Sequence, residues 1–183
     1  MKKIFLFLAN GFEEIEAIAT VDVLRRGEIG VTTVSISDKK EVTGAHNVTV
    51  LADVLFNETN FNEGDMLVLP GGMPGASNLN EHEGLKQLLL KYNAEGKLIT
   101  AICAAPLVLG GLGLLKDKRA TCYPSFEPTL TGATHVEDGV VVDGNITTGK
   151  GPGFTIDFAL TLVQQLQGKG MADEVAGGML YKS

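Results

Sequence analysis

The sequence predicts an α/β fold in which a mostly parallel sheet carries helices on both faces. Short apolar runs, typical of buried strands, alternate along the chain with segments of helical character. This alternation favours a parallel sheet, because each connecting helix packs back onto it. The 183 residues are 44% hydrophobic, which is enough for a sizeable core. Since no linker, repeat or low-complexity block divides them, we expect residues 1–183 to form a single domain.

The first half of the chain supplies four of the predicted strands and two of the helices. Its first helix is indicated by acidic residues in the first turn and arginines in the last, which match the helix dipole. The strand that follows alternates β-branched and small side chains. The predicted strands are residues 3–8, 31–37, 48–51 and 65–69, and the predicted helices are residues 13–26 and 84–93.

The second half begins with a buried strand and a helix that has proline in its first turn, where the missing N–H costs nothing. Several short strands and two helices follow, of which the first is strongly amphipathic. The predicted strands are residues 98–102, a short strand near Ala120, and residues 134–136, 140–142 and 146–148. The later helices are residues 155–167 and 171–179.

Composition excludes several classes of partner. A net charge of −7 and a pI near 4.9 argue against binding to nucleic acid or to an anionic membrane. The longest apolar stretch, residues 101–115, is shorter than the roughly 18 residues of a spanning helix. Two cysteines do not make a disulfide framework. The sequence therefore predicts a cytoplasmic protein that binds neither nucleic acid nor membrane.

Cys103 lies where a buried strand ends and a helix begins, in the segment ITAICAAP. A thiol there faces the positive end of a helix dipole, and the thiolate is the reactive form of cysteine. The pattern is similar to a nucleophile elbow, with cysteine in the place of the nucleophile and without the full G-x-S-x-G signature. The alternative is an inert core residue, since free cysteine is among the most buried residue types.

Two further features follow predicted strands. Gly71 and Gly72 come after residues 65–69, and the N–H of Gly72 with that of Ala104 could form an oxyanion hole beside Cys103. The alternative for these glycines is a turn that needs positive φ. Ligands of parallel sheets bind beyond the carboxyl ends of the strands, so these loops and residues 11–16 mark the predicted site.

Glu16 lies in the first turn of the first predicted helix, with Glu13 and Glu14. Complementing the helix dipole would explain all three acids. Glu16 differs because its neighbours are apolar. If it points toward a thiolate, the two negative charges cannot both persist, and the pair shares a proton and titrates as a unit. A protonated carboxyl beside a thiolate can serve as general acid and base.

The sequence offers no pattern for a metal or a cofactor. His46, His82 and His135 have no metal-ligand spacing, and no Cys/His cluster exists. The segment GNITTGKG matches part of a phosphate-binding loop, but Gly151 stands where that motif requires Ser or Thr, and residues 146–148 have strand character. We therefore expect neither a metal site nor a bound cofactor.

Four ordered motifs carry a family resemblance. They are GFEEIE with DVLRR at residues 11–26, LPGG at residues 69–72, AICAAP at residues 101–106, and GPG with DFAL at residues 151–160. With these motifs the chain resembles the ThiJ/PfpI superfamily, and within it the DJ-one branch. The resemblance implies a flavodoxin-like three-layer sandwich and a homodimer with the site near the interface.

The resemblance also implies roles for single residues. Cys103 would be the nucleophilic, redox-active thiol, with Glu16 as the buried acid beside it. Gly72 and Ala104 match backbone amides around the sulfur, and Gly71 adjoins them. Arg26 matches a basic residue near the site and the interface. His46 falls roughly where some members place an arginine.

The chain differs from the pattern of this family at one position. Several members carry histidine before a proline near the cysteine, and here the matching segment is Cys122-Tyr123-Pro124. Tyr123 can donate a hydrogen bond but is a poor base, because its ordinary pKa is about 10. A structural role is expected for Cys122, since nothing in the sequence brings it to Cys103.

The resemblance implies a cysteine-dependent, glutathione-independent glyoxalase, or a deglycase, that acts on small reactive dicarbonyls or glycated substrates. The alternative from another class is an oxidative-stress sensor or chaperone that uses reversible oxidation of Cys103 without turnover. A purely structural module is a third hypothesis. A cysteine peptidase or amidase is poorly supported, because proteolytic members place histidine directly after the cysteine, and here Ala104 follows it.

Overall fold

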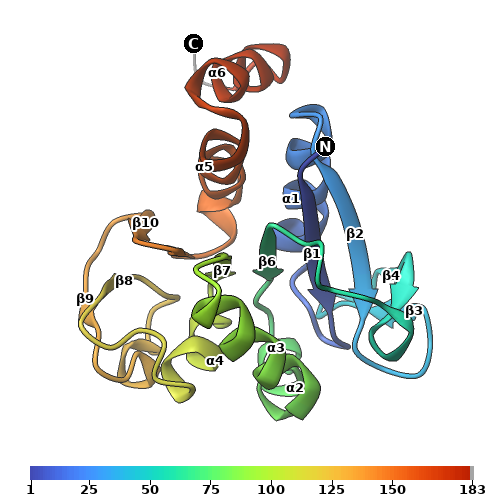
Figure 1. The fold of residues 1–183 in the computed structure, drawn as a ribbon, viewed down its shortest axis with the longest axis vertical. Helices are drawn as coiled ribbons and strands as arrows, with labels where there is room; N and C mark the ends of the chain where they lie inside the picture. Colours follow the sequence, from blue (N-terminus) through green and yellow to red (C-terminus); the bar gives the residue numbers. More distant parts are fainter. Residues whose placement is uncertain (182–183) are drawn as a thin grey trace.

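The computed structural model describes residues 1–181 and consists of a central sheet between two layers of helices (Figure 1). The strands are β1 (Lys3–Leu8), β2 (Gly30–Ser35), β3 (Glu41–Thr43), β4 (Thr49–Leu51), β5 (Val54–Leu55), β6 (Met66–Leu69), β7 (Leu98–Ile102), β8 (Arg119–Ala120), β9 (Thr134–His135), β10 (Val140–Asp143) and β11 (Ile146–Gly149). The α-helices are α1 (Glu14–Arg26), α2 (Gly75–Glu81), α3 (Glu83–Ala94), α4 (Pro106–Gly111), α5 (Thr155–Gln167) and α6 (Lys169–Gly178). Short 3₁₀ turns are η1 (Phe56–Glu58), η2 (Glu127–Thr129) and η3 (Pro152–Phe154).

The main sheet has seven strands in the order β10-β11-β7-β6-β1-β2-β5. Every neighbouring pair is parallel except β10 with β11, which are antiparallel. Two small ladders stand apart from it: the antiparallel hairpin of β3 and β4, and the parallel pair of β8 and β9. The predicted mostly parallel α/β sheet is confirmed.

The alternation of side chains along β1 divides the interior into two cores. Ile4, Leu6 and Leu8 point to the side of the sheet covered by α1, α5 and α6. Phe5 and Phe7 point to the other side, which is covered by α2, α3 and α4. In Figure 1, α5 and α6 lie near the top and α2, α3 and α4 near the bottom. Because successive strand residues face opposite sides, one buried strand contributes to both cores, as a three-layer sandwich requires.

Most predicted elements are confirmed within one or two residues, but the sequence analysis did not predict β3, β5 and α2. β3 and β5 are short, with three and two residues. Helix α2 begins with glycine after Pro74 and contains Ser77, Asn78 and Asn80, all weak helix formers. Its buried Ala76 and Leu79 pack into the cores, so tertiary packing stabilises a helix that propensity does not predict.

The topology brings three loops to one edge of the sheet. β1, β6 and β7 are adjacent and parallel, so the loops that follow them all leave from the same edge. These loops hold residues 9–13, residues 70–74 and Cys103.

Among residues 1–181, no helix combines the length and hydropathy needed to cross a bilayer.

Candidate active site

Backbone hydrogen bonds join the loops at this edge of the sheet. Glu13 N–H donates to the Gly71 carbonyl at 2.9 Å, and Gly75 N–H donates to the Gly11 carbonyl at 3.2 Å. Tyr123 N–H also donates to the Cys103 carbonyl at 2.9 Å. The predicted convergence of the strand-end loops is therefore present, and it includes the segment of Tyr123.

Cys103 has a backbone conformation that few side chains other than glycine adopt. Its φ is +65°, in the left-handed region, and its N–H donates to the Gly149 carbonyl at 2.9 Å. Helix α4 begins three residues later with Pro106 at its first turn. Strained φ at a strand-to-helix turn is the defining feature of a nucleophile elbow, so that prediction matches the geometry.

Glu16 is fully buried and lies directly against the Cys103 thiol. One carboxyl oxygen, Oε2, accepts a hydrogen bond from Gly71 N–H at 2.7 Å, and the carboxyl also hydrogen-bonds with the Cys103 side chain. The other oxygen, Oε1, has no hydrogen-bond partner among the described residues. A buried oxygen without a donor destabilises a carboxylate more than a neutral carboxyl, which favours the protonated form.

The electrostatics of this pair follow from its burial. Burial raises the pKa of Glu16 to about 7, against the lowering effect of its bonds with Cys103 and Gly71. Burial and the Glu16 carboxylate also raise the pKa of the Cys103 thiol, whereas the N–H groups of Gly72 and Ala104, which donate to the sulfur, lower it. The helix start alone therefore does not bring the pKa of the thiol below its ordinary value. A thiolate forms here when Glu16 takes up the proton.

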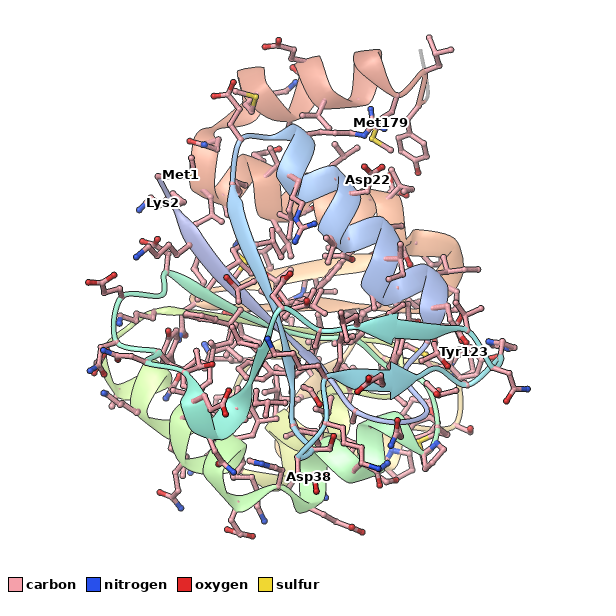
Figure 2. All side chains as sticks on the ribbon, turned by 90° about the vertical axis from the view of Figure 1, so that its right-hand side faces the viewer. Met1, Lys2, Asp22, Asp38, Tyr123 and Met179 are labelled. Carbon is pink, nitrogen blue, oxygen red and sulfur yellow. The ribbon has the colours of Figure 1, made fainter. Side chains whose placement is uncertain are left out.

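Cys103 opens onto a cavity of about 450 Å³. Its lining residues are Glu13, Ile15, His46, Gly72, Met73, Cys103, Ala104, Tyr123, Phe126 and Pro152. Tyr123 lies on the same side of the molecule as the β3–β4 hairpin, which carries His46 (Figure 2). A cavity of this volume with a nucleophile on its wall can hold a small-molecule substrate.

Glu14 and His46 form a pair at this cavity that the sequence analysis did not find. Glu14 Oε2 lies 2.9 Å from His46 Nδ1, and Oε1 accepts hydrogen bonds from the N–H groups of His46 at 2.7 Å and Val48 at 3.3 Å. His46 Nδ1 is also 3.5 Å from Glu13 Oε2. Ligand-type atoms of these three residues lie within 4.8 Å of one another, so they are a candidate cation cluster that motif spacing could not reveal.

Arg26 is not brought to the site within the chain. It lies at the last turn of α1, about ten residues beyond Glu16, or roughly 15 Å along a helix. Its side chain pairs with Asp22 at 3.1 Å and faces α6 near Met171 and Glu174. The expectation of a basic residue near Cys103 is therefore wrong for a single chain.

Cys122 is buried but belongs to the other core. Cys103 lies in the core covered by α1, α5 and α6, and Cys122 in the core covered by α2, α3 and α4. Both are free thiols, and burial raises the pKa of Cys122 to about 11. This environment agrees with the structural role expected for Cys122.

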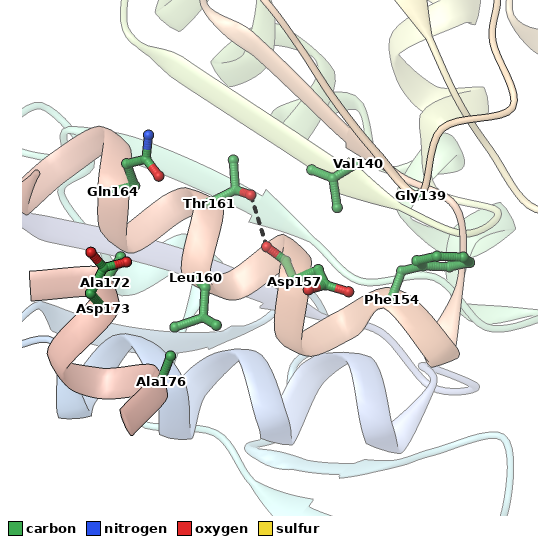
Figure 3. Close-up of a pocket in the computed structure, with 10 residues that line it drawn as sticks. All are labelled: Gly139, Val140, Phe154, Asp157, Leu160, Thr161, Gln164, Ala172, Asp173 and Ala176. Atoms are coloured by element: carbon green, nitrogen blue, oxygen red, sulfur yellow. Dashed lines mark hydrogen bonds between the residues drawn. The ribbon is translucent and has the colours of Figure 1, made fainter. Parts of the chain in front are cut away.

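A second cavity, of about 400 Å³, lies between β10, α5 and α6 (Figure 3). Phe154 closes one end of this cavity beside Gly139. Within α5, Thr161 Oγ1 donates to the Asp157 carbonyl at 2.8 Å. None of its ten lining residues is a cysteine or a histidine. The chemistry of the Cys103 cavity is therefore not repeated there.

Apolar side chains are exposed on α1 and the β3–β4 hairpin. Ile15, Ile18, Val48 and Leu51 are each between 45% and 68% exposed. Exposed apolar side chains of this size are compatible with a protein interface. The homodimer stays a prediction, because the structure describes one chain.

Replacing Gly71 with alanine is expected to destabilise the site. A Cβ on Gly71 would lie 2.7 Å from Cys103 Cβ, 2.8 Å from Glu16 Oε2 and 2.9 Å from the Ile102 carbonyl oxygen. Overpacking of this kind lowers the free energy of unfolding by about 2 kcal/mol. Urea denaturation measures it, with Gly153→Ala as the control, since a Cβ there meets nothing within 4 Å. Equal midpoints for the two variants would contradict the described packing.

Comparison with known proteins agrees with this geometry. A model of the DJ-1/PfpI family matches residues 2–165. Protein DJ-1 homolog B of Arabidopsis thaliana is 42% identical over 183 residues, which cover 99% of this chain and 42% of the relative. Protein dj-1beta of Drosophila melanogaster is 39% identical over 181 residues, covering 98% and 97%. The glutathione-independent glyoxalase DJR-1.2 of Caenorhabditis elegans is 37% identical over 158 residues, covering 85% and 83%. The chain spans less than half the length of the Arabidopsis relatives it matches.

Solved structures agree with the sequence comparisons. The C103A mutant of a DJ-1 superfamily protein from Salmonella typhimurium superposes with a TM-score of 0.96 at 38% identity, covering all of both chains. The oxidised form of Toxoplasma gondii DJ-1 superposes with a TM-score of 0.96 at 36% identity, again covering all of both chains. These matches extend over the sheet, both helical layers, the turn that carries Cys103 and the start of α1 with Glu16. The chain belongs to the DJ-1/PfpI family.

Proposed function

We propose that this protein converts small reactive dicarbonyls, such as methylglyoxal and glyoxal, into 2-hydroxy acids without glutathione. The observation that carries the proposal is the contact between Cys103 and Glu16 at a small cavity, with the N–H groups of Gly72 and Ala104 directed at the sulfur. The Caenorhabditis elegans relative is named a glutathione-independent glyoxalase, which supports the same activity in this family.

The proposed reaction starts with proton transfer from the Cys103 thiol to Glu16. The thiolate then adds to the aldehyde carbon, and the aldehyde oxygen, stabilised beside the N–H groups of Gly72 and Ala104, takes the proton from Glu16. The product of this step is a hemithioacetal. Glu16, now a carboxylate, removes the hydrogen of that carbon as a proton and returns one to the neighbouring carbon. The hydroxyl proton of the hemithioacetal moves to the oxygen of the neighbouring carbon, which leaves a carbonyl on the carbon bonded to sulfur. The resulting thioester is hydrolysed by water to the 2-hydroxy acid and the free thiol.

Burial supports the role of Glu16 in these steps. A carboxyl with a pKa of about 7 is protonated in part and ionised in part at neutral pH, so it can both donate and accept a proton. Its zero exposure keeps bulk water away from the carboxyl, which holds the pKa near neutrality. A deglycase would use the same thiolate attack on an early adduct.

The test measures loss of methylglyoxal and formation of lactate by the purified protein, with no glutathione present. We expect both at equal rates, since the reaction adds water and rearranges hydrogen without an external oxidant. A protein that consumes methylglyoxal without releasing lactate is only alkylated by it. Such a result, or no consumption at all, would overturn the proposal.

A second proposed function is an oxidation sensor centred on the same sulfur. A sulfinate on Cys103 would accept hydrogen bonds from the N–H groups of Gly72 and Ala104 and from a protonated Glu16. The oxidised Toxoplasma gondii relative supports this proposal.

Mild hydrogen peroxide is expected to add two oxygen atoms to Cys103 and none to Cys122. Two molecules of peroxide supply the oxygens and leave as water. Cys103 lines the open cavity and can pass its proton to Glu16, whereas Cys122 is 1% exposed and lies in the other core, away from that cavity. Peptide mass spectrometry over a peroxide titration measures the selectivity. Equal oxidation of the two cysteines would count against a sensor.

A further inference from the structure

The proposed reaction ends with hydrolysis, and that step needs a base that meets water. Glu16 is fully buried against Cys103 and is not among the residues that line the cavity, so it does not meet solvent water. The water that attacks a thioester on Cys103 must enter through the open cavity. A base on the wall of that cavity is therefore required for efficient release of product.

His46 is placed on that wall by Glu14. The imidazole is 69% exposed, lines the cavity with Cys103, and directs Nδ1 to Glu14 Oε2 at 2.9 Å. The same carboxylate fixes the turn between β3 and β4 through the N–H groups of His46 and Val48. Gly44 makes this approach possible, because a Cβ there would overlap the Glu14 carboxylate. With Nδ1 engaged, Nε2 is the nitrogen left for a molecule in the cavity.

The charges around His46 favour a base at this position. The bond to Glu14, with the charges of Glu13 and Glu14, raises the pKa of His46. Those two acids face it from the start of α1, and Cys103 and Tyr123 are the titratable groups on the other parts of the wall. Tyr123 carries a phenol, which is a far weaker base than an imidazole. A carboxylate behind an imidazole orients it and stabilises its protonated form, as in catalytic triads.

We propose that His46, positioned by Glu14, is the catalytic base that activates water for hydrolysis of the thioester on Cys103. This inference rests on the proposed glyoxalase function. As the water oxygen bonds to the acyl carbon, a proton moves from water to His46 Nε2. The carbon–sulfur bond then breaks, and the proton passes from His46 to the departing sulfur. The 2-hydroxy acid leaves and the thiol is restored, with no oxidant or reductant consumed.

The test compares the protein with its His46→Asn variant, using methylglyoxal as substrate and quenching at intervals for mass spectrometry. We expect lactate formation to fall about 10²-fold in the variant. We also expect Cys103 to be acylated as fast as before and to accumulate as the thioester. Added imidazole should restore part of the turnover, because it can replace a missing base. His135→Asn is the matched control, since His135 lies outside the cavity.

The Glu14→Gln variant tests the positioning role. Removing the carboxylate charge lowers the pKa of His46, so the pH at which product release becomes half-maximal should move to lower values. Circular dichroism of the variant shows whether the β3–β4 turn still folds. An unchanged pH profile in a folded Glu14→Gln protein would overturn the positioning role of Glu14.

The outcomes separate this inference from the function on which it rests. No lactate from the unaltered protein would overturn the glyoxalase proposal itself. Lactate at an equal rate from the His46→Asn variant, without accumulated thioester, would overturn the role of His46 alone. Slower acylation of Cys103 in that variant would also overturn it. Activity that a chelator removes and zinc restores would assign Glu13, Glu14 and His46 to a cation instead.

Discussion

Replacing Cys103 with serine is expected to lower lactate formation from methylglyoxal by about 10³-fold or more. A serine hydroxyl is a far weaker acid than a thiol, so the Glu16 carboxyl, with a pKa of about 7, cannot take its proton to a useful extent. The φ of +65° and the hydrogen bond to the Gly149 carbonyl do not depend on the sulfur, so the fold should persist. Initial rates of lactate formation measure the effect.

The matched control for this prediction is Cys122→Ser. Cys122 is 1% exposed and lies in the other core, so this variant makes the same chemical change at a buried thiol away from the cavity. It should keep its rate within a factor of about three, with a small loss of stability. A Cys103→Ser protein that retains more than a tenth of the activity would show that another group performs the chemistry.

The sequence predicted the position of Cys103 and Glu16 because both signals are local. An apolar strand followed by small residues and Pro106 marks a strand-to-helix turn, and an acid among apolar neighbours marks a buried carboxyl. Their contact then follows from topology, since the strands before them belong to one parallel sheet and their loops share an edge. What the sequence left open was the direction of the thiol pKa, which depends on burial that only the packed structure defines.

The pair of Glu14 and His46 could not be predicted in this way. The two residues are 32 positions apart, and they meet because a hairpin outside the main sheet folds back onto the start of α1. The helix dipole already explains an acid such as Glu14 in the first turn, so nothing in the sequence indicated its contact with His46. The prediction that Arg26 lies near the site was wrong for a different reason. Arg26 is on the same helix as Glu16 but at its other end, so the length of the helix separates it from the site.

Replacing Glu16 with glutamine is expected to lower activity and raise stability at alkaline pH. Glutamine can keep the hydrogen bond from Gly71 but cannot exchange a proton, so turnover should fall by about 10²- to 10⁴-fold. The folded-state pKa of about 7 lies above the unfolded value of 4.5. The folded protein therefore holds this proton more tightly, and stability is lost as the pH rises from 4.5 through 7. The loss amounts to about 3 kcal/mol at pH 8, and the variant should not show it.

Urea denaturation at pH 5 and pH 8 measures this difference, with Glu174→Gln as the control at an exposed acid on α6. We expect the Glu16→Gln protein to match the unaltered protein at pH 5 and to exceed it at pH 8, while the control follows the unaltered protein at both. A variant that is inactive but no more stable at pH 8 would mean that Glu16 is not held near neutrality by burial. Because the same burial both destabilises the ionised carboxyl and enables it to move protons at neutral pH, gain of stability and loss of turnover should appear together.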